Sequence, residues 1–297
     1  MLQTKNLSIS YRDSLKLLSN HLNELGADNT HIILSLLADT ISKDTLFILS
    51  NPDNLLTLKE TQSLDRLIDK LKRSQPVSYI LRNTPFFKEI YSTPPGVLIP
   101  RPETELLVQL SLKYINTING KNEIKNCLEI GTGSGCISIS ILNNTKSIIN
   151  FTSTDISDFA LKIAKKNSEQ ILPTDIQTRI KFIKSDFLNS SLDGIFDLII
   201  SNPPYIPIDE YNGLSESLMF EPRIALTDNE NGLVFYKRLS EIITNHMSIH
   251  GVLLMEIHSE HAQKVKKIFK EDHGNKVRLT VHKDTFGRDR VLEVMWK

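Results

Sequence analysis

The tetrapeptide Asn202-Pro203-Pro204-Tyr205 joins a carboxamide, two rigid prolines and an aromatic ring directly after the apolar run Phe196–Ser201. That run is typical of a buried strand, and the prolines fix φ and remove two backbone donors, so the chain leaves the strand as a stiff turn. The carboxamide offers a donor and an acceptor, and the ring can stack on a flat group. The segment could therefore hold a planar amino group, or it could be an ordinary turn at a strand end.

A glycine-rich loop lies earlier in the chain. Asn126–Ile130 is a candidate buried strand, the loop Gly131-Thr132-Gly133-Ser134-Gly135 follows it, and residues 136–142 form an apolar run that we expect to be helical. Glycines allow a tight turn and a close approach of ligand to backbone, and a helix N-terminus offers free N–H groups. The spacing G-x-G-x-G differs from the dinucleotide fingerprint G-x-G-x-x-G. By itself the loop is compatible with a dinucleotide, a nucleoside or no ligand.

An acidic residue ends the next strand candidate, Ile148–Asp155. A carboxylate at the end of the strand that follows a glycine loop can accept hydrogen bonds from both hydroxyls of a ribose. The alternative is that Asp155 caps the helix expected to begin near Ser157. The carboxylate therefore favours a nucleoside ligand only in combination with the glycine loop.

A third strand candidate, Ile180–Ser185, is followed by Asp186 and Phe187. The Phe187 ring could lie against a purine, and it could equally belong to the core. The carboxyl ends of parallel strands meet at one edge of an α/β sheet, and such sheets bind their ligands there. We therefore expect the glycine loop, the two carboxylates, the ring and Asn202 to surround one ligand.

Taken together, Glu129-x-Gly131-x-Gly133-x-Gly135, Asp155 and Asn202-Pro-Pro-Tyr205 resemble the class I S-adenosylmethionine-dependent N-methyltransferases. Three further segments narrow the resemblance to the HemK/PrmC family: Leu98–Glu105, Phe220–Leu226 and Gly287–Val291. That family methylates the glutamine of the Gly-Gly-Gln motif in bacterial class I peptide chain release factors. The resemblance runs from about Pro76 to the C-terminus.

The resemblance implies a set of site residues. The S-adenosylmethionine site is expected to comprise Glu129, Gly131, Thr132, Gly133, Ser134, Gly135, Asp155, Asp186, Phe187 and Asn202. Asn202, Pro203, Pro204 and Tyr205 are expected to be catalytic and to bind the amide of the substrate. Arg101, Glu103 and Glu221 are further candidates for substrate binding. An alternative role for Glu103 is a favourable negative charge at a helix N-terminus.

The charge balance does not favour a protein that binds nucleic acid. Lys plus Arg number 35 and Asp plus Glu number 35, so the formal net charge is zero, whereas duplex affinity depends largely on cations that neutralise phosphates. The two cysteines, Cys127 and Cys136, lack metal-ligand spacing, and we interpret them as reduced residues of a cytoplasmic protein. We expect no metal, and the lack of a long apolar stretch or leader predicts no membrane insertion or export.

The pattern of apolar residues divides the chain. In residues 1–85 leucines recur at helical intervals, as at Leu15, Leu18 and Leu22, which predicts a small helical domain. Our hypothesis is that this domain docks the protein substrate. Residues 86–100 are predicted to form a β-hairpin linker, and residues 101–297 the methyltransferase domain.

Helices and strands alternate from residue 103 onward, which indicates a parallel sheet. The last two strand candidates, Val277–Lys283 and Arg290–Trp296, are too close in sequence for a crossover helix and should be antiparallel. With the resemblance, the expected fold is α/β: a Rossmann-like, seven-stranded class I methyltransferase sheet with an antiparallel last strand. A small all-α N-terminal domain and the hairpin linker precede it.

Three functions are compatible with these residues. The first, implied by the resemblance, is glutamine N5 methylation of class I release factors, with no membrane and no direct nucleic-acid partner. The second is methylation of an exocyclic amino group in DNA or RNA, since Asn-Pro-Pro-Tyr also suits adenine, or of a glutamine in a ribosomal protein. The third is a non-catalytic module that binds S-adenosylmethionine. Such a module would be expected to have a damaged Asn202–Tyr205 segment, and here the segment is intact.

Overall fold

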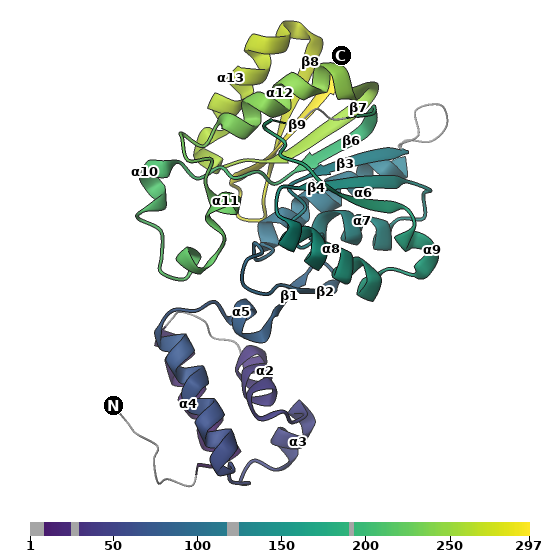
Figure 1. Ribbon diagram of the computed structural model, residues 1–297. Coiled ribbons are helices and arrows are strands. Elements are labelled where there is room, and N and C mark those ends of the chain that lie inside the picture. The colour runs from purple at the N-terminus through teal and green to yellow at the C-terminus, as the bar shows by residue number, and fades with distance from the viewer. Residues whose placement is uncertain (1–8, 25–29, 118–124, 190–192) are drawn as a thin grey trace. The chain divides into compact units, whose positions relative to one another are not determined.

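A computed structural model describes residues 9–24, 30–117, 125–189 and 193–297. The chain forms two compact units: residues 1–83 with 215–220, and residues 84–214 with 221–297 (Figure 1). Within the expected helical domain of residues 1–85, residues 1–8 and 25–29 lie outside the described part.

The first unit is helical. Its helices are α1 (Tyr11–Glu24), α2 (Thr30–Ile41), α3 (Thr45–Ser50), α4 (Leu58–Lys72) and α5 (Val77–Leu81). The leucine faces meet in one core, which includes Leu18, Leu22, Leu36, Leu37, Leu64, Leu67 and Leu71. α4 begins with a capping box, because Thr57 accepts from the Glu60 N–H and the Glu60 side chain accepts from the Thr57 N–H.

A β-hairpin follows the helices. Its strands are β1 (Asn83–Phe86) and β2 (Glu89–Ser92), so they overlap the expected linker range of residues 86–100 only in part. The turn between the two strands falls at Phe87, which has φ of 58°. The hairpin does not continue through Pro94 and Pro95, because a proline has no N–H to donate to a neighbouring strand. The Tyr91 hydroxyl lies 2.7 Å from the Ser140 hydroxyl and joins the hairpin to the second unit's core.

The second unit is built on a seven-stranded sheet. The strands are β3 (Asn126–Ile130), β4 (Asn150–Asp155), β5 (Ile180–Lys184), β6 (Phe196–Ser201), β7 (Met247–Glu256), β8 (Val277–Lys283) and β9 (Asp289–Trp296). Their order is β5-β4-β3-β6-β7-β9-β8. The neighbouring strands β5, β4, β3, β6 and β7 pair in parallel, and β9 pairs antiparallel with both β7 and β8. The predicted seven-stranded sheet with an antiparallel last strand is therefore confirmed.

Helices cover both faces of this sheet (Figure 1). One face packs against α6 (Glu105–Thr117) and α7 (Cys136–Asn144), and the other against α12 (Val234–His246) and α13 (Ala262–His273). In β6, Leu198 and Ile200 join the first core and Ile199 joins the second, because successive side chains of a strand point to opposite faces. The strand is buried on both sides, which explains its uninterrupted apolar sequence.

The second unit also contains α8 (Asp158–Ile171), α9 (Thr174–Gln177), α10 (Ile208–Tyr211), α11 (Arg223–Leu226) and short 3₁₀ turns at Pro102–Thr104, Ser259–His261 and Gly274–Lys276. The 3₁₀ turn at Leu218–Phe220 belongs to the first unit. In the described part of the chain, no helix has the length and apolar character needed to cross a bilayer.

Strand order reverses between β3 and β6, since the chain winds from β3 outward to β5 and then returns to the other side of β3. In open α/β sheets this switch point leaves a crevice beyond the carboxyl ends of the strands, and ligands bind in it. The fold therefore specifies where a site should lie.

Candidate active site

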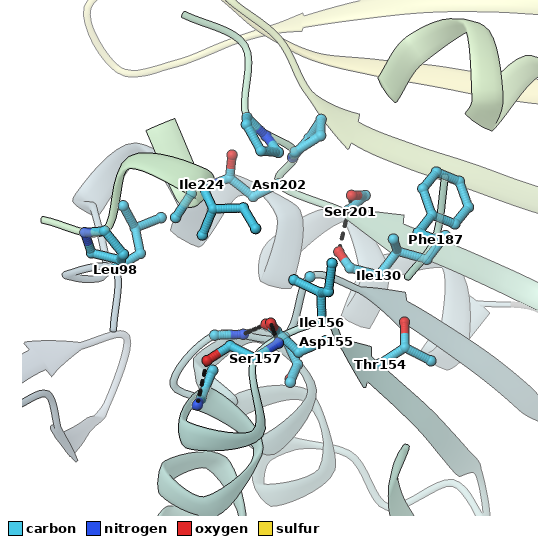
Figure 2. A pocket seen from close by; sticks show the side chains of 18 of the residues that line it. Leu98, Ile130, Thr154, Asp155, Ile156, Ser157, Phe187, Ser201, Asn202 and Ile224 are labelled. Carbon is cyan, nitrogen blue, oxygen red and sulfur yellow. Dashed lines mark hydrogen bonds between the residues drawn. The ribbon is translucent and has the colours of Figure 1, made fainter. Parts of the chain in front are cut away.

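A cavity of about 350 Å³ opens at this switch point (Figure 2). Its volume is in the range of small-molecule sites, about 300–1,000 Å³. Of the residues expected to form the site, those that line it are Arg101, Gly131, Thr132, Gly133, Ser134, Asp155, Asp186, Phe187, Asn202, Pro203 and Pro204. The expected residues that do not line it are Glu103, Glu129, Gly135, Tyr205 and Glu221.

The strand register explains why distant residues meet here. Ile130, the last residue of β3, pairs with Thr154 of β4 on one side and with Ser201 of β6 on the other. The Ser201 hydroxyl also donates to the Ile130 carbonyl at 3.0 Å (Figure 2). The glycine loop after β3 and Asn202 after β6 therefore leave the sheet at the level where Asp155 ends β4.

The glycines of the loop have two different roles. Gly131 and Gly133 have φ of 75° and 56°, a backbone conformation that favours glycine, and a Cβ on either would meet no atom within 4 Å. The open space beside them is available to a ligand. At Gly135 a Cβ would come within 2.7 Å of Ile139 Cδ1 and 3.2 Å of Ala164 Cβ. Gly135 therefore allows α7 to pack closely, and its contribution to the cavity is indirect.

Glu129 orders the glycine loop through hydrogen bonds. Its Oε2 accepts hydrogen bonds from the Thr132 hydroxyl at 2.7 Å and the Ser153 hydroxyl at 3.1 Å. Burial raises the pKa of Glu129 from 4.5 to about 7, although the hydroxyls of Ser138, Thr132 and Ser153 favour the charged form. The carboxyl group thus orders the loop without lining the cavity.

Asp155 lines the cavity and is tied to the glycine loop. Its Oδ2 accepts from the Gly133 N–H and its Oδ1 from the Ser157 N–H, both at 2.9 Å. Burial raises the pKa of Asp155, and these backbone donors oppose the rise. The residue that caps α8 is Ser157, whose Oγ accepts from the Ala160 N–H. Each carboxylate oxygen keeps an accepting site for a ligand hydroxyl.

Asp186 and Phe187 form the next part of the wall. Asp186 accepts from the Leu188 N–H at 3.2 Å and from Asn189 Nδ2 at 2.7 Å, so it shapes the turn after β5. The Phe187 ring stacks on Phe235 with centroids 6.3 Å apart and planes at 16°. It belongs to the core and also lines the cavity. The core interpretation is therefore confirmed, and contact with a purine stays a prediction.

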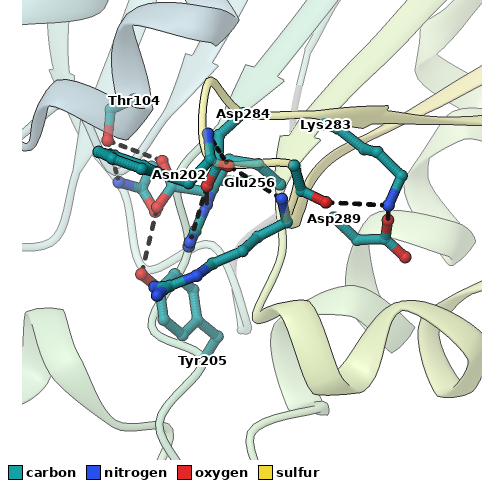
Figure 3. Close-up of polar contacts among 11 residues, drawn as sticks. Thr104, Asn202, Tyr205, Glu256, Lys283, Asp284 and Asp289 are labelled. Atoms are coloured by element: carbon teal, nitrogen blue, oxygen red, sulfur yellow. Dashed lines mark hydrogen bonds and ion pairs between the residues drawn. The ribbon is translucent and has the colours of Figure 1, made fainter.

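Asn202 enters the cavity wall with a defined orientation. Its Nδ2 donates to the Thr104 hydroxyl at 3.2 Å (Figure 3). No residue in the described ranges donates to its Oδ1, so this oxygen is left for a ligand. Pro203 and Pro204 line the cavity beside it.

Tyr205 is not among the residues that line the cavity, and the stacking of its ring on a bound amide stays a prediction. Its hydroxyl donates to Glu256 Oε1 at 3.1 Å (Figure 3), and its ring lies 5.9 Å from that of His258. Burial and the nearby Glu256 carboxylate raise the pKa of Tyr205, so its hydroxyl keeps its proton. The physical reason for the orientation is the demand of a buried carboxylate for donors.

Two of the three candidates for substrate binding, Arg101 and Glu221, form an ion pair in which only the glutamate is fully buried. Arg101 lines the cavity, and its Nη2 pairs with Oε1 of Glu221. The other oxygen of Glu221 accepts from the Ile99 N–H at 3.0 Å. Glu221 therefore joins two segments far apart in sequence, while Glu103 is half-buried and takes no part in the lining.

Two functional candidates, Thr104 and Glu256, were not predicted. Thr104 is buried and lines the cavity, and Glu256 is a buried carboxyl group at the end of β7. A carboxyl group that ends an apolar strand is the same signal that pointed to Asp155, so Glu256 could have been found. The hydroxyl of Thr104 carries no comparable signal. Among the residues that the structure describes, no group of side chains could hold a metal ion.

The sequence matches the Methyltransferase small domain family over residues 108–229. It is 37% identical over 264 residues to the release factor glutamine methyltransferase of Clostridium botulinum, covering 87% of this chain and 89% of that protein. It is 36% identical over 240 residues to the release factor glutamine methyltransferase of Lactococcus lactis, covering 80% and 84% respectively. It is also 34% identical to the bifunctional methyltransferase of Rickettsia bellii, but spans only 50% of that longer protein.

A solved structure shares the fold. The hMettl16 catalytic domain in complex with the MAT2A 3'UTR hairpin 6 superposes with a TM-score of 0.54 and 17% sequence identity, covering 82% of this chain and 84% of that one. At this identity the similarity concerns the fold alone.

The buried Glu129 should make stability depend on pH. Its pKa in the fold, about 7, exceeds the ordinary 4.5, so its favourable contribution is complete below about pH 4.5 and is lost as pH rises through about 7. Relative to Glu129→Gln, the wild-type free energy of unfolding should fall by about 3 kcal/mol over that range. Urea denaturation of both proteins across this range measures the difference, and a difference that does not vary with pH would contradict the assignment.

Proposed function

The chain belongs to the release factor glutamine methyltransferase family, and we propose that it methylates N5 of the glutamine in the Gly-Gly-Gln motif of class I peptide chain release factors. The methyl donor is S-adenosylmethionine. One observation carries the proposal. A single cavity is lined both by groups suited to a nucleoside, namely the glycine loop and Asp155, and by the Asn202 carboxamide, whose oxygen is available to a ligand.

The residues present fit S-adenosylmethionine. Gly131 and Gly133 leave open space where side chains would stand. Asp155 offers acceptors for ribose hydroxyls, and Phe187 offers an apolar ring to an adenine. When bound, S-adenosylmethionine supplies a methyl group on a positively charged sulfur, which is already a strong electrophile.

The protein's task is then to prepare the attacking nitrogen. An amide nitrogen is a poor nucleophile, because its lone pair is delocalised into the carbonyl group. Asn202 Oδ1 and the Pro203 carbonyl would accept the two amide hydrogens and favour the pyramidal geometry that the nitrogen needs in the transition state. Interactions that are stronger in the transition state than in the ground state lower the barrier.

The same residues orient the glutamine and limit its motion. The rigid Pro203-Pro204 segment fixes where the carbonyl of Pro203 lies relative to the carboxamide. Holding two reacting groups in line contributes to rate by removing their translational and rotational freedom in advance. No general base is needed before transfer, since the nitrogen becomes acidic only once it is methylated and can lose its proton to water.

The competing substrates are less well supported. A duplex substrate requires cations to neutralise phosphates, and this chain has zero formal net charge. A glutamine of a ribosomal protein would use the same chemistry, but the segment Pro100–Glu103 follows the release-factor branch. We place the enzyme in the cytoplasm, where release factors act, and the two buried cysteines are free thiols there.

We also propose that the helical unit docks the release factor. Several large apolar side chains of this unit are exposed: Leu46, Phe47, Leu49, Leu55 and Leu58. They fall within thirteen consecutive residues, on α3, on the start of α4 and on the connection between them. A concentration of exposed apolar side chains of this kind marks a surface for binding a protein.

The substrate assignment is tested with labelled S-adenosylmethionine. The enzyme is offered a class I release factor, the same factor with the Gly-Gly-Gln glutamine replaced by alanine, and duplex DNA. Label should enter the unmodified release factor alone. Label on DNA, or equal label on the substituted factor, would overturn the assignment.

Substitutions of Asn202 and of Asp155 should affect kcat and cofactor affinity differently. Asn202→Ala should lower kcat by about 100-fold or more and change cofactor affinity little, because its acceptor serves the substrate amide. Asp155→Ala should weaken cofactor binding by about 10- to 100-fold, the worth of a hydrogen bond to a charged group. Calorimetric titration with S-adenosylhomocysteine and steady-state kinetics measure the two effects.

The exposed Asp158→Ala, three residues from Asp155, is the matched control and should leave both quantities unchanged. Equal loss of cofactor affinity in the Asn202 and Asp155 variants would contradict this division of roles.

The docking role predicts a change in KM for the protein substrate. Leu46→Ser with Leu58→Ser should raise the KM for the release factor by at least about tenfold, the factor expected for losing the burial of one leucine, and leave the KM for S-adenosylmethionine unchanged. The control, Ile148→Ser with Ile249→Ser, removes equally exposed side chains near the amino ends of β4 and β7. An unaltered KM for the release factor would exclude this docking surface.

A further inference from the structure

Glu256 links the two ends of the Asn202–Tyr205 segment through hydrogen bonds. Its Oε2 accepts from the Thr104 hydroxyl at 2.7 Å, and its Oε1 accepts from the Tyr205 hydroxyl at 3.1 Å (Figure 3). The Thr104 hydroxyl in turn accepts from Asn202 Nδ2 at 3.2 Å. Glu256 itself is 1% exposed and does not line the cavity.

The polarity of this chain of hydrogen bonds follows from proton counting. An ionised carboxylate only accepts, and a threonine hydroxyl has one proton to donate. Because Thr104 gives its proton to Glu256, it can only accept from Asn202. The Asn202 carboxamide must therefore present its NH₂ group to Thr104 and its oxygen away from it, which settles an orientation that the shape of the amide alone leaves ambiguous.

We propose that Glu256 is a positioning residue, which acts through the Thr104 hydroxyl to hold the Asn202 carboxamide with its oxygen toward the substrate. The inference rests on the proposed function, because only a substrate that donates from an amino group needs an acceptor at this point. A carboxamide turned by 180° would present its NH₂ group to the substrate NH₂, and neither could accept.

Three neighbours of Glu256 favour the charged form that this role requires, although the net effect of burial is to raise its pKa. Burial raises the pKa of Glu256, and the hydrogen bonds from Thr104 and Tyr205 and the positive charge of Arg290 oppose that rise. Arg290 is held in place by Asp284 at 3.3 Å (Figure 3). The negative charge of Glu103 acts in the opposite direction.

The backbone around Glu256 is also restrained. Its carbonyl accepts from the Tyr236 hydroxyl at 3.0 Å, and the next residue, Ile257, donates its N–H to the Arg290 carbonyl at 2.8 Å. A carboxylate fixed in this way can impose its orientation on a neighbouring loop, because its own position does not adjust.

The test removes the middle of the chain of hydrogen bonds. Thr104→Val keeps the shape of the side chain but removes the hydroxyl, and Thr104→Ser restores the hydroxyl. With a release factor as substrate, Thr104→Val should lower kcat by about 10- to 100-fold, the cost of a misplaced reacting group, with cofactor affinity changed by less than about threefold. Thr104→Ser should recover most of kcat, and Glu256→Gln should lower it, since one of its two acceptors becomes a donor.

A second measurement does not depend on turnover. The NMR signal of the Asn202 side-chain NH₂ group, assigned by its loss in Asn202→Ala, reports the hydrogen bond to Thr104. It should shift in Thr104→Val and in Glu256→Gln and return in Thr104→Ser. Glu293→Gln is the matched control, since Glu293 is a buried carboxyl group on the adjacent strand β9 that bonds to His282 instead. It should leave both the signal and kcat unchanged.

The outcomes separate the two proposals. If the wild-type enzyme labels no release factor while the NMR signal shifts as expected, the substrate assignment fails and the positioning role stands. If the signal does not move in Thr104→Val, or if that variant loses kcat and cofactor affinity in parallel, the positioning role is overturned whatever the substrate.

Discussion

The site depends on the parallel register of three strands. Ile130 and Ser201 are the last residues of β3 and β6, and Thr154, which pairs with Ile130, is the last but one of β4. The glycine loop and Asn202 therefore leave the sheet close to Asp155. A shift by one residue in any of these pairings would turn its side chains to the other face of the sheet. Most residues of these three strands are buried, which maintains the register, and the glycine loop, the carboxylate and the carboxamide meet as a result.

Three buried carboxylates then organise the loops that the strands deliver. Glu129 receives hydroxyls from Thr132 and Ser153, Glu221 receives Arg101 and the Ile99 N–H, and Glu256 receives Thr104 and Tyr205. A buried carboxyl group is unfavourable without hydrogen-bond donors, so each of the three restricts its neighbours to the few arrangements that supply them. These three side chains do not line the cavity, but their hydrogen bonds fix the positions of residues that do.

Much of the fold and part of the site could be predicted from local pattern. The strand candidates Asn126–Ile130 and Phe196–Ser201 have the predicted bounds, and Ile148–Asp155 begins only two residues before β4. The lining positions of Asp155 and Asn202 followed from their places at strand ends. The orientation of Tyr205 did not, because its ring is directed by Glu256, 51 residues away in sequence. The hairpin strands begin earlier than the expected linker, since the left-handed turn at Phe87 carried no glycine to reveal it.

The sequence by itself determined the chemical groups and the strand ends that carry them, because periodicity, glycine placement and proline rigidity act over a few residues. Only the tertiary structure decided how those groups face one another. Hydrogen-bond partners such as Thr104 and Glu256 are 152 residues apart, and which of them donates depends on every other donor and acceptor packed nearby. The direction in which Asn202 presents its oxygen is therefore a property of the folded protein and cannot be read from any one segment.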